Sequence, residues 1–326
     1  MNTVSKSSAA GFLHPSQNTL IMIVRPQQHW FRRLFVWHGS VLPKILFRLS
    51  LNFGFACIAV VCYLWHEMLD VNLTLAPFSL LGVAIAIFLG FRNNASYARF
   101  TEARLLWGNL LITARSLLRE VKSLMPDPAE QARYFTSLLI AFTYCLKHQL
   151  RKTDMRIDVD RLLAPSERNS VLNSHSPCNT LLLKMGMWLG EQRRLGRISD
   201  ISFHSIDSNL NHLSSILGGC ERISNTPIPF AYSLIVHRTV YLFCALLPFA
   251  LVSDLHYLTP LVSVFISYTF ISLDSLAEEL EDPFGMAPND LPLNAISATI
   301  EINLREMIED DEKPIPMKPD HHCLLS

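Results

Sequence analysis

Two long stretches of the chain, residues 49–91 and 239–273, contain no lysine or arginine. Apolar segments in and beside these stretches are about 17 residues long or longer, and about 20 apolar residues carry a helix across the hydrocarbon core of a bilayer. The apolar segments are residues 49–65, 75–91, 228–252 and 257–273. They predict four membrane spans in two hairpins. The alternative is four core helices of a soluble protein, which would not exclude basic residues so completely.

The composition agrees with a protein that is part membrane and part aqueous. The 326 residues are 50% hydrophobic and only 17% charged, which is too apolar for an ordinary soluble domain. The formal net charge is zero, so no basic surplus points to a nucleic-acid partner. The seven cysteines form no CxxC pair, so we expect neither a disulfide framework nor a metal centre, and a reducing compartment for most of the chain.

The short loops predict the orientation in the membrane. Loop 66–77 contains Glu67 and Asp70, and loop 253–260 contains Asp254, but neither loop contains a lysine or arginine. The positive-inside rule therefore places both termini and the long central segment in the cytoplasm. We expect a multi-pass protein of the plasma (inner) membrane.

The central segment has helical signals and no β alternation. An amphipathic pattern continues from the second span to Pro126, and Asp127 with Pro128 is a typical start for the next helix. Ser176-Pro177 predicts another start with a stop at Gly196. Asp200 is a candidate cap for a helix that ends at Gly218-Gly219, and residues 153–175 are interpreted as a polar connector.

The expected fold class is therefore all-α, with long helices that run from a four-span membrane part into a cytoplasmic helical part. The expected units are an N-terminal leader and cytoplasmic segment, the first transmembrane hairpin, the cytoplasmic helical region, the second hairpin and a cytoplasmic C-terminal tail. They cover residues 1–40, 41–91, 92–227, 228–273 and 274–326. Residues 1–21 are interpreted as a loose, dispensable leader, with Met22 as a possible true start.

Two rows of residues spaced four apart run along the second apolar segment. One row is small and would let another helix approach closely, which makes it a candidate for helix packing; it consists of Gly82, Ala86 and Gly90. The other row is large and apolar and could face lipid, the protein core or a pore; it consists of Val83, Ile87 and Phe91.

Three motifs resemble the bestrophin family in its prokaryotic branch. They are "PFSLLGVAIAIF" followed by "LGFRNNASYARFTEARLLWG" (77–108), "GRISDISFHSIDSNLNHL" (196–213) followed by "PIPFAYSLIVHRTVYLF", and "SLDSLAEELEDPFG" (272–285). Together they extend over most of residues 25–300 in the family's order and spacing.

The resemblance implies a homopentameric ion channel with one central pore. Val83, Ile87 and Phe91 would then form three apolar rings of a narrow neck, and Ile201 a second constriction at the cytoplasmic end. Animal bestrophins carry an acidic run after PFG that helps to bind calcium. Here the run is "MAPNDLPLN", with Asp290 as its only acid, and Ca²⁺ prefers six to eight oxygen ligands. We therefore expect no obligatory calcium, no metal site and no cofactor.

The sign of the permeating ion is predicted from the acidic residues. Rings of carboxylates at a pore mouth concentrate cations. Glu67, Asp70 and Asp254 would line the outer mouth, and Asp200 would lie beside the inner constriction. Helix N-termini near Ile201 oppose this with partial positive charges. The prediction is a channel for monovalent cations over chloride; an anion channel, as in animal bestrophins, is the alternative.

The residues leave two further functional classes open, a membrane-embedded enzyme and a membrane scaffold. A membrane-embedded lipid-modifying enzyme would need paired titratable groups, and Asp274, Glu278 and Glu279 are the nearest candidates. Their spacing favours a solvated helix end instead, so an enzyme is not expected. A membrane scaffold without transport is the other alternative. "DHHC" (320–323) matches a palmitoyltransferase signature but lacks the surrounding cysteine-rich domain.

Overall fold

The computed structural model describes residues 22–23, 30–33, 37, 39–65, 75–126, 128–317 and 324–325. Within these residues the chain is helical, apart from connecting segments and one antiparallel pair of two-residue strands. The strands are β1 (Met22–Ile23) and β2 (Leu324–Leu325). The helices are α1 (Trp30–Arg33), α2 (Leu42–Trp65), α3 (Leu75–Leu124), α4 (Pro128–Arg151), α5 (Arg156–Leu162), α6 (Pro165–Leu172), α7 (Pro177–Arg194), α8 (Asp200–Asn225), α9 (Phe230–Leu255), the 3₁₀ turn η1 (His256–Leu258), α10 (Thr259–Glu281) and α11 (Leu293–Met307).

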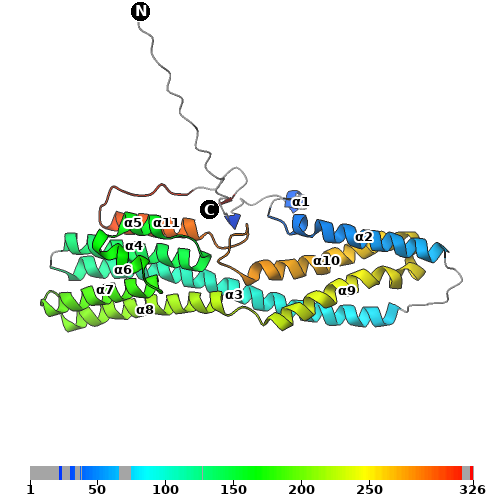
Figure 1. The fold of residues 1–326 in the computed structure, drawn as a ribbon, viewed down its shortest axis with the longest axis horizontal. Coiled ribbons are helices and arrows are strands. Elements are labelled where there is room, and N and C mark those ends of the chain that lie inside the picture. Colours follow the sequence, from blue (N-terminus) through cyan, green and yellow to red (C-terminus); the bar gives the residue numbers. More distant parts are fainter. Residues whose placement is uncertain are drawn as a thin grey trace, which may run out of the picture.

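The helices form two groups that share α3 (Figure 1). One group contains α2, the first part of α3, α9 and α10; the other contains the rest of α3 with α4 to α8 and α11. The 50 residues of α3 correspond to about 75 Å at 1.5 Å per residue. That length is more than twice the thickness of a bilayer core, so one helix extends through both groups.

Among the described residues, three helical segments are long and apolar enough to cross a membrane. They are Leu42–Trp65, Leu75–Leu124 and Phe230–Glu281. The third segment holds the last two apolar stretches of the sequence, because the turn η1 folds α10 back against α9. Helix α2 begins at Leu42, seven positions before the expected residue 49, and α10 begins at Thr259 rather than at residue 257.

Each group has its own apolar core. In the apolar group, side chains of all four helices meet, among them Ile45, Ile85, Val240 and Ile271. In the other group α3 contributes Trp107, which is completely buried. Helix α3 therefore packs against the three apolar helices along its first part and against the helices of the second core along the rest.

Arg99 joins the two groups. Its guanidinium donates to the carbonyls of Ile223 and Thr226 at the end of α8, each at 2.6 Å, and to the carbonyl of Glu281 at the end of α10 at 3.1 Å. Carbonyls at the end of a helix lack intrahelical donors and carry partial negative charge. One cation of α3 therefore satisfies the ends of two helices.

Three local expectations for the second group are wrong. Residues 153–175 contain α5 and α6, because Val159 and Val171 are buried in the core and give short helices an inner face. The cap of α8 is Ser199, whose side chain accepts from the backbone nitrogen of Ser202. The helix also continues past Gly219, since the missing side chain there makes room for Leu106 of α3.

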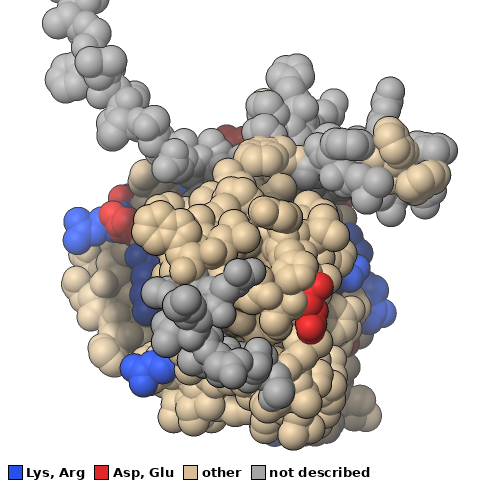
Figure 2. Space-filling model, turned by 90° about the vertical axis from the view of Figure 1, so that its right-hand side faces the viewer, with Lys and Arg blue, Asp and Glu red and all other residues tan. Residues whose placement is uncertain are grey.

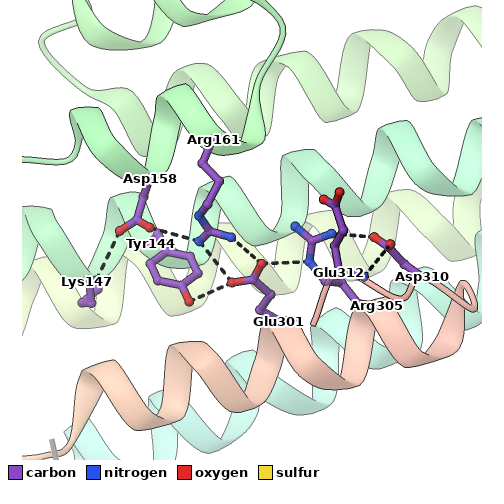
Figure 3. Close-up of polar contacts among 8 residues, drawn as sticks. All are labelled: Tyr144, Lys147, Asp158, Arg161, Glu301, Arg305, Asp310 and Glu312. Atoms are coloured by element: carbon purple, nitrogen blue, oxygen red, sulfur yellow. Dashed lines mark hydrogen bonds and ion pairs between the residues drawn. The ribbon is translucent and has the colours of Figure 1, made fainter. Parts of the chain in front are cut away.

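A buried polar network attaches α11 to α4 and α5 (Figure 3). Glu301 of α11 is 1% exposed and accepts hydrogen bonds from Tyr144 at 2.8 Å, Arg161 at 2.5 Å and Arg305 at 2.8 Å. Burial alone would raise the pKa of Glu301, but the bonds from Arg161 and Tyr144 lower it below its usual value. The carboxylate is therefore held in its charged form, as a buried acid must be if it is to bind two cations.

Candidate ion pathway

The three proposed neck residues lie on an exposed face of α3. Val83 is 60% exposed, Ile87 53% and Phe91 62%. Large apolar side chains in such a row are costly to leave in water, so this face of a single chain requires lipid, another protein surface or a pore lumen.

The row of small residues next to it meets different surroundings. Gly82 packs against the ring of Phe243 on α9, where an added Cβ would lie 3.4 Å from the nearest ring atom. Ala86 and Gly90 lie on the exposed side, and nothing in the chain comes within 4 Å of a Cβ built at Gly90. Of the two glycines in this row, Gly82 makes the close helix contact within one chain and Gly90 does not.

Arg92 explains how α3 passes from apolar to charged sequence without a break. Its side chain turns away from the exposed row and pairs with the buried carboxylate of Asp274 on α10. The second oxygen of Asp274 lies 2.7 Å from Nδ1 of His237 on α9. The expectation of a solvated helix end is therefore wrong for Asp274, because its charge is compensated inside the protein.

A second polar contact ties the apolar helices together. Asn52 of α2 donates to the carbonyl of Cys244 on α9 at 2.6 Å and accepts from the hydroxyl of Ser263 on α10 at 3.2 Å. A buried amide in an apolar bundle needs such partners. Asn52 therefore forms hydrogen bonds from α2 to both α9 and α10.

The proposed inner constriction lies at the first turn of α8. Ile201 is 85% exposed, and the neighbouring Asp200 is also exposed. Nε of Arg193 lies 2.7 Å from Oδ1 of Asp200. This ion pair offsets part of the negative charge that the sequence assigned to this ring.

Only one acidic residue of the proposed outer mouth lies within the described residues. Asp254 is exposed near the end of α9, whereas Glu67 and Asp70 lie outside the described residues. Figure 2 looks onto this end of the molecule, and most of the described surface there is uncharged. Asp254 is therefore the acid of the proposed outer mouth whose position the structure describes.

The loop after α10 contains Asp290, the only acid in the segment that corresponds to the calcium-binding run of animal bestrophins. Asp290 is buried and accepts from the backbone nitrogen of Ala287 at 2.6 Å. Burial, with the nearby charges of Asp282 and Glu279, raises the pKa of Asp290 to about 6. Glu279 is bound to Lys44 at 2.6 Å. Among the described residues, no group of three or more histidines, cysteines, aspartates or glutamates is placed to hold a metal ion.

Sequence reasoning missed the pairings between residues that lie far apart in the chain. Arg92 and Asp274 are 182 positions apart, and Arg99 and Glu281 are the same number apart. A signal was present, since Arg92 interrupts an apolar pattern that continues beyond it. Local spacing alone names no partner for such a residue.

Apolar helices with internally paired charges and a row of exposed apolar side chains define an α-helical membrane protein. A profile of the Bacterial/Fungal Bestrophin family matches residues 22–306, and the chain belongs to this family. Its relatives are ion channels rather than enzymes, which confirms the resemblance seen in the sequence.

Relatives of similar length support the assignment. The chain is 60% identical over 305 residues to "Voltage-dependent anion channel-forming protein YneE" of Escherichia coli K12, covering 94% of this chain and 100% of that protein. It is 46% identical to "Voltage-dependent anion channel-forming protein RSc3414" of Ralstonia nicotianae, covering 88% and 94%. A crystal structure of a bacterial bestrophin homolog from Klebsiella pneumoniae has 57% identity and a TM-score of 0.80, over 82% of this chain and 99% of that one.

Proposed function

We propose that the chain assembles as a homopentamer around one pore that passes monovalent ions and favours cations such as Na⁺ or K⁺ over chloride. Its four apolar helices would span the inner membrane, with both termini in the cytoplasm. The observation that carries the channel proposal is the exposed row Val83, Ile87 and Phe91 on α3. Apolar rings of this kind obstruct a narrow pore by excluding water.

The preference for cations depends on charge at the outer mouth. Asp254 is exposed at the end of α9, and five copies would place five carboxylates around the entrance. Full negative charges at a pore mouth raise the local concentration of cations. Asp200 contributes less than its sequence suggests, because Arg193 is bound to it.

Anion conduction is the second candidate, because the relatives YneE and RSc3414 are named voltage-dependent anion channel-forming proteins. The N-terminus of α8 beside Ile201 would also present partial positive charge to the lumen. The two candidates differ in a single measurable quantity, the reversal potential under a salt gradient.

The test uses purified protein in planar bilayers under a KCl gradient. Cation preference predicts a reversal potential near the potassium equilibrium potential. Asp254→Asn should shift it toward zero, while Glu191→Gln, an exposed change in the second helix group, should leave it unchanged. A reversal near the chloride equilibrium potential supports the anion candidate instead, and the absence of current argues for a scaffold.

Orientation is tested separately with Asp254→Cys. A membrane-impermeant thiol reagent should label this cysteine in intact spheroplasts. Labelling that requires permeabilised cells would contradict cytoplasmic termini.

The requirement for calcium is tested with the same bilayer recordings. The current should be unchanged by a calcium chelator if calcium is not required.

A further inference from the structure

Asp274 binds two helices through its two carboxylate oxygens. Oδ1 accepts from Nη1 of Arg92 on α3, and Oδ2 lies 2.7 Å from Nδ1 of His237 on α9. Asp274 itself is on α10 and is 0% exposed. One buried carboxylate therefore holds three of the four apolar helices at the same level.

This contact determines which way Phe91 points. Successive residues of an α-helix are turned by about 100°, so an inward anchor at Arg92 directs its neighbour Phe91 sideways and outward. The burial agrees, because Arg92 is 5% exposed while Phe91 is 62% exposed. Ile87 and Val83 continue the same exposed row. A shift of Arg92 relative to Asp274 would rotate the whole row.

The charges around His237 come from every helix that packs near it. Glu281 of α10 lies 3.9 Å from the Arg92 guanidinium. The ring of Tyr241 is 4.4 Å from the imidazole, centroid to centroid, and the hydroxyl of Tyr241 accepts from Arg48 of α2 at 2.6 Å. Glu278 is close enough to interact electrostatically with Tyr241. The next residue on α9, Arg238, is exposed.

A histidine in this position can change its charge without losing its hydrogen bond. A neutral imidazole donates through Nδ1 to Asp274, and a protonated imidazole donates through the same atom with an added positive charge. Imidazole is the side chain that ordinarily changes charge between pH 5 and 8. The side chain of His237 is 43% exposed in the single chain, while its partner Asp274 is buried.

We propose that Asp274 is a positioning residue for the neck, and that His237 makes its hold on α3 and α9 respond to protons. Protonation adds an attraction to the Asp274 carboxylate, draws α9 and α10 together beside Arg92 and stiffens the ring of Phe91. Because an apolar ring conducts only when it widens enough to admit water, acid pH reduces conduction. The inference rests on the proposed role of Phe91 in the pore.

The experiment measures ion flux from liposomes that contain the purified full-length protein, at several values between pH 5 and 8. We expect the flux of the unchanged protein to fall about fivefold or more at the acid end. His237→Gln keeps a side chain that can donate to Asp274 but cannot titrate, so its flux should be nearly independent of pH. His175→Gln changes an exposed histidine between α6 and α7 and should retain the full response.

Asp274→Asn provides a second reading. This variant should also lose the pH response. Size-exclusion chromatography shows whether the variant still assembles. If assembly is lost, the result for His237→Gln decides. A pH response that is absent from the unchanged protein, or retained in His237→Gln, overturns the inference while leaving the channel proposal intact. Absence of ion flux at every pH overturns the channel proposal, and this inference with it.

Discussion

Arg161 donates to both carboxylate oxygens of Glu301, from Nη1 to Oε1 at 2.5 Å and from Nη2 to Oε2 at 3.1 Å. The two residues are 140 positions apart, on α5 and α11. Glu301 is almost completely buried, so this pair holds α11 against the second helix group and is not a surface ion pair. The contact explains why the C-terminal helix stays with a core that is formed largely by residues before α9.

Glu301→Gln should destabilise this part of the protein. The substitution removes the carboxylate charge that Arg161 and Arg305 share, although each keeps a second acidic partner, Asp158 and Asp310. Because the side chain of Arg161 is 39% exposed, we expect a cost of about 1–3 kcal/mol, as for loss of a hydrogen-bonding partner. Urea denaturation of the purified protein measures the loss. Glu191→Gln removes an exposed partner of Arg194 and should cost about 0.5 kcal/mol or less. Equal effects of the two substitutions would contradict a structural role for Glu301.

Asp290 should make the protein less stable as pH rises through the range of its titration. Its folded pKa is about 6 against an ordinary value of 3.8. Between these values the folded state binds a proton that the unfolded state has lost, so the free energy of unfolding falls with rising pH. Asp290→Asn should remove this slope between pH 4 and 6 and raise stability at neutral pH. Thermal unfolding over that range checks the sign, and a steeper slope in the variant would contradict it.

Smaller side chains in the neck should increase ion flux. Ile87→Ala and Phe91→Ala widen the apolar rings, and Ile201→Ala widens the inner constriction. A gain of about fivefold corresponds to a barrier lowered by about 1 kcal/mol. Phe88→Ala is the comparison variant, because Phe88 lies outside the row of neck residues and lines a cavity of about 260 Å³ beside Tyr232 and Ile235. Unchanged flux in all three variants, with assembly intact, would exclude these residues from the limiting path.

Three cysteines of the second helix group should resist thiol reagents while the protein is folded. Burial raises the pKa of Cys145 and of Cys220 to about 12, and raises that of Cys178 well above its usual value. The reactive thiolate is therefore scarce and inaccessible at neutral pH. Mass spectrometry should find label on all three only in urea, whereas Ser214→Cys, at an exposed position of α8, should be labelled at once. Rapid labelling of Cys145 in the folded protein would disprove the protection.

The sequence predicted the elements whose signals are local. Absence of cations marked the apolar helices because a charge in lipid is costly, and Pro128 and Pro177 marked the starts of α4 and α7 because proline suits the first helical turn. Prediction was wrong where a distant partner decides. Gly219 ends no helix because Leu106 needs the space, and Asp274 is not solvated because Arg92 neutralises it. Such pairings depend on the assembled fold.

The uninterrupted course of α3 has a mechanical consequence. Ile85 and Leu89 belong to one core and Trp107 and Leu110 to the other, yet all four are on the same helix. A protein or ligand that tilts the second helix group would therefore move the apolar part of α3 as well, because no break in the helix separates the two parts. Force applied to the second helix group would reach Phe91, in the proposed neck, as a displacement along α3.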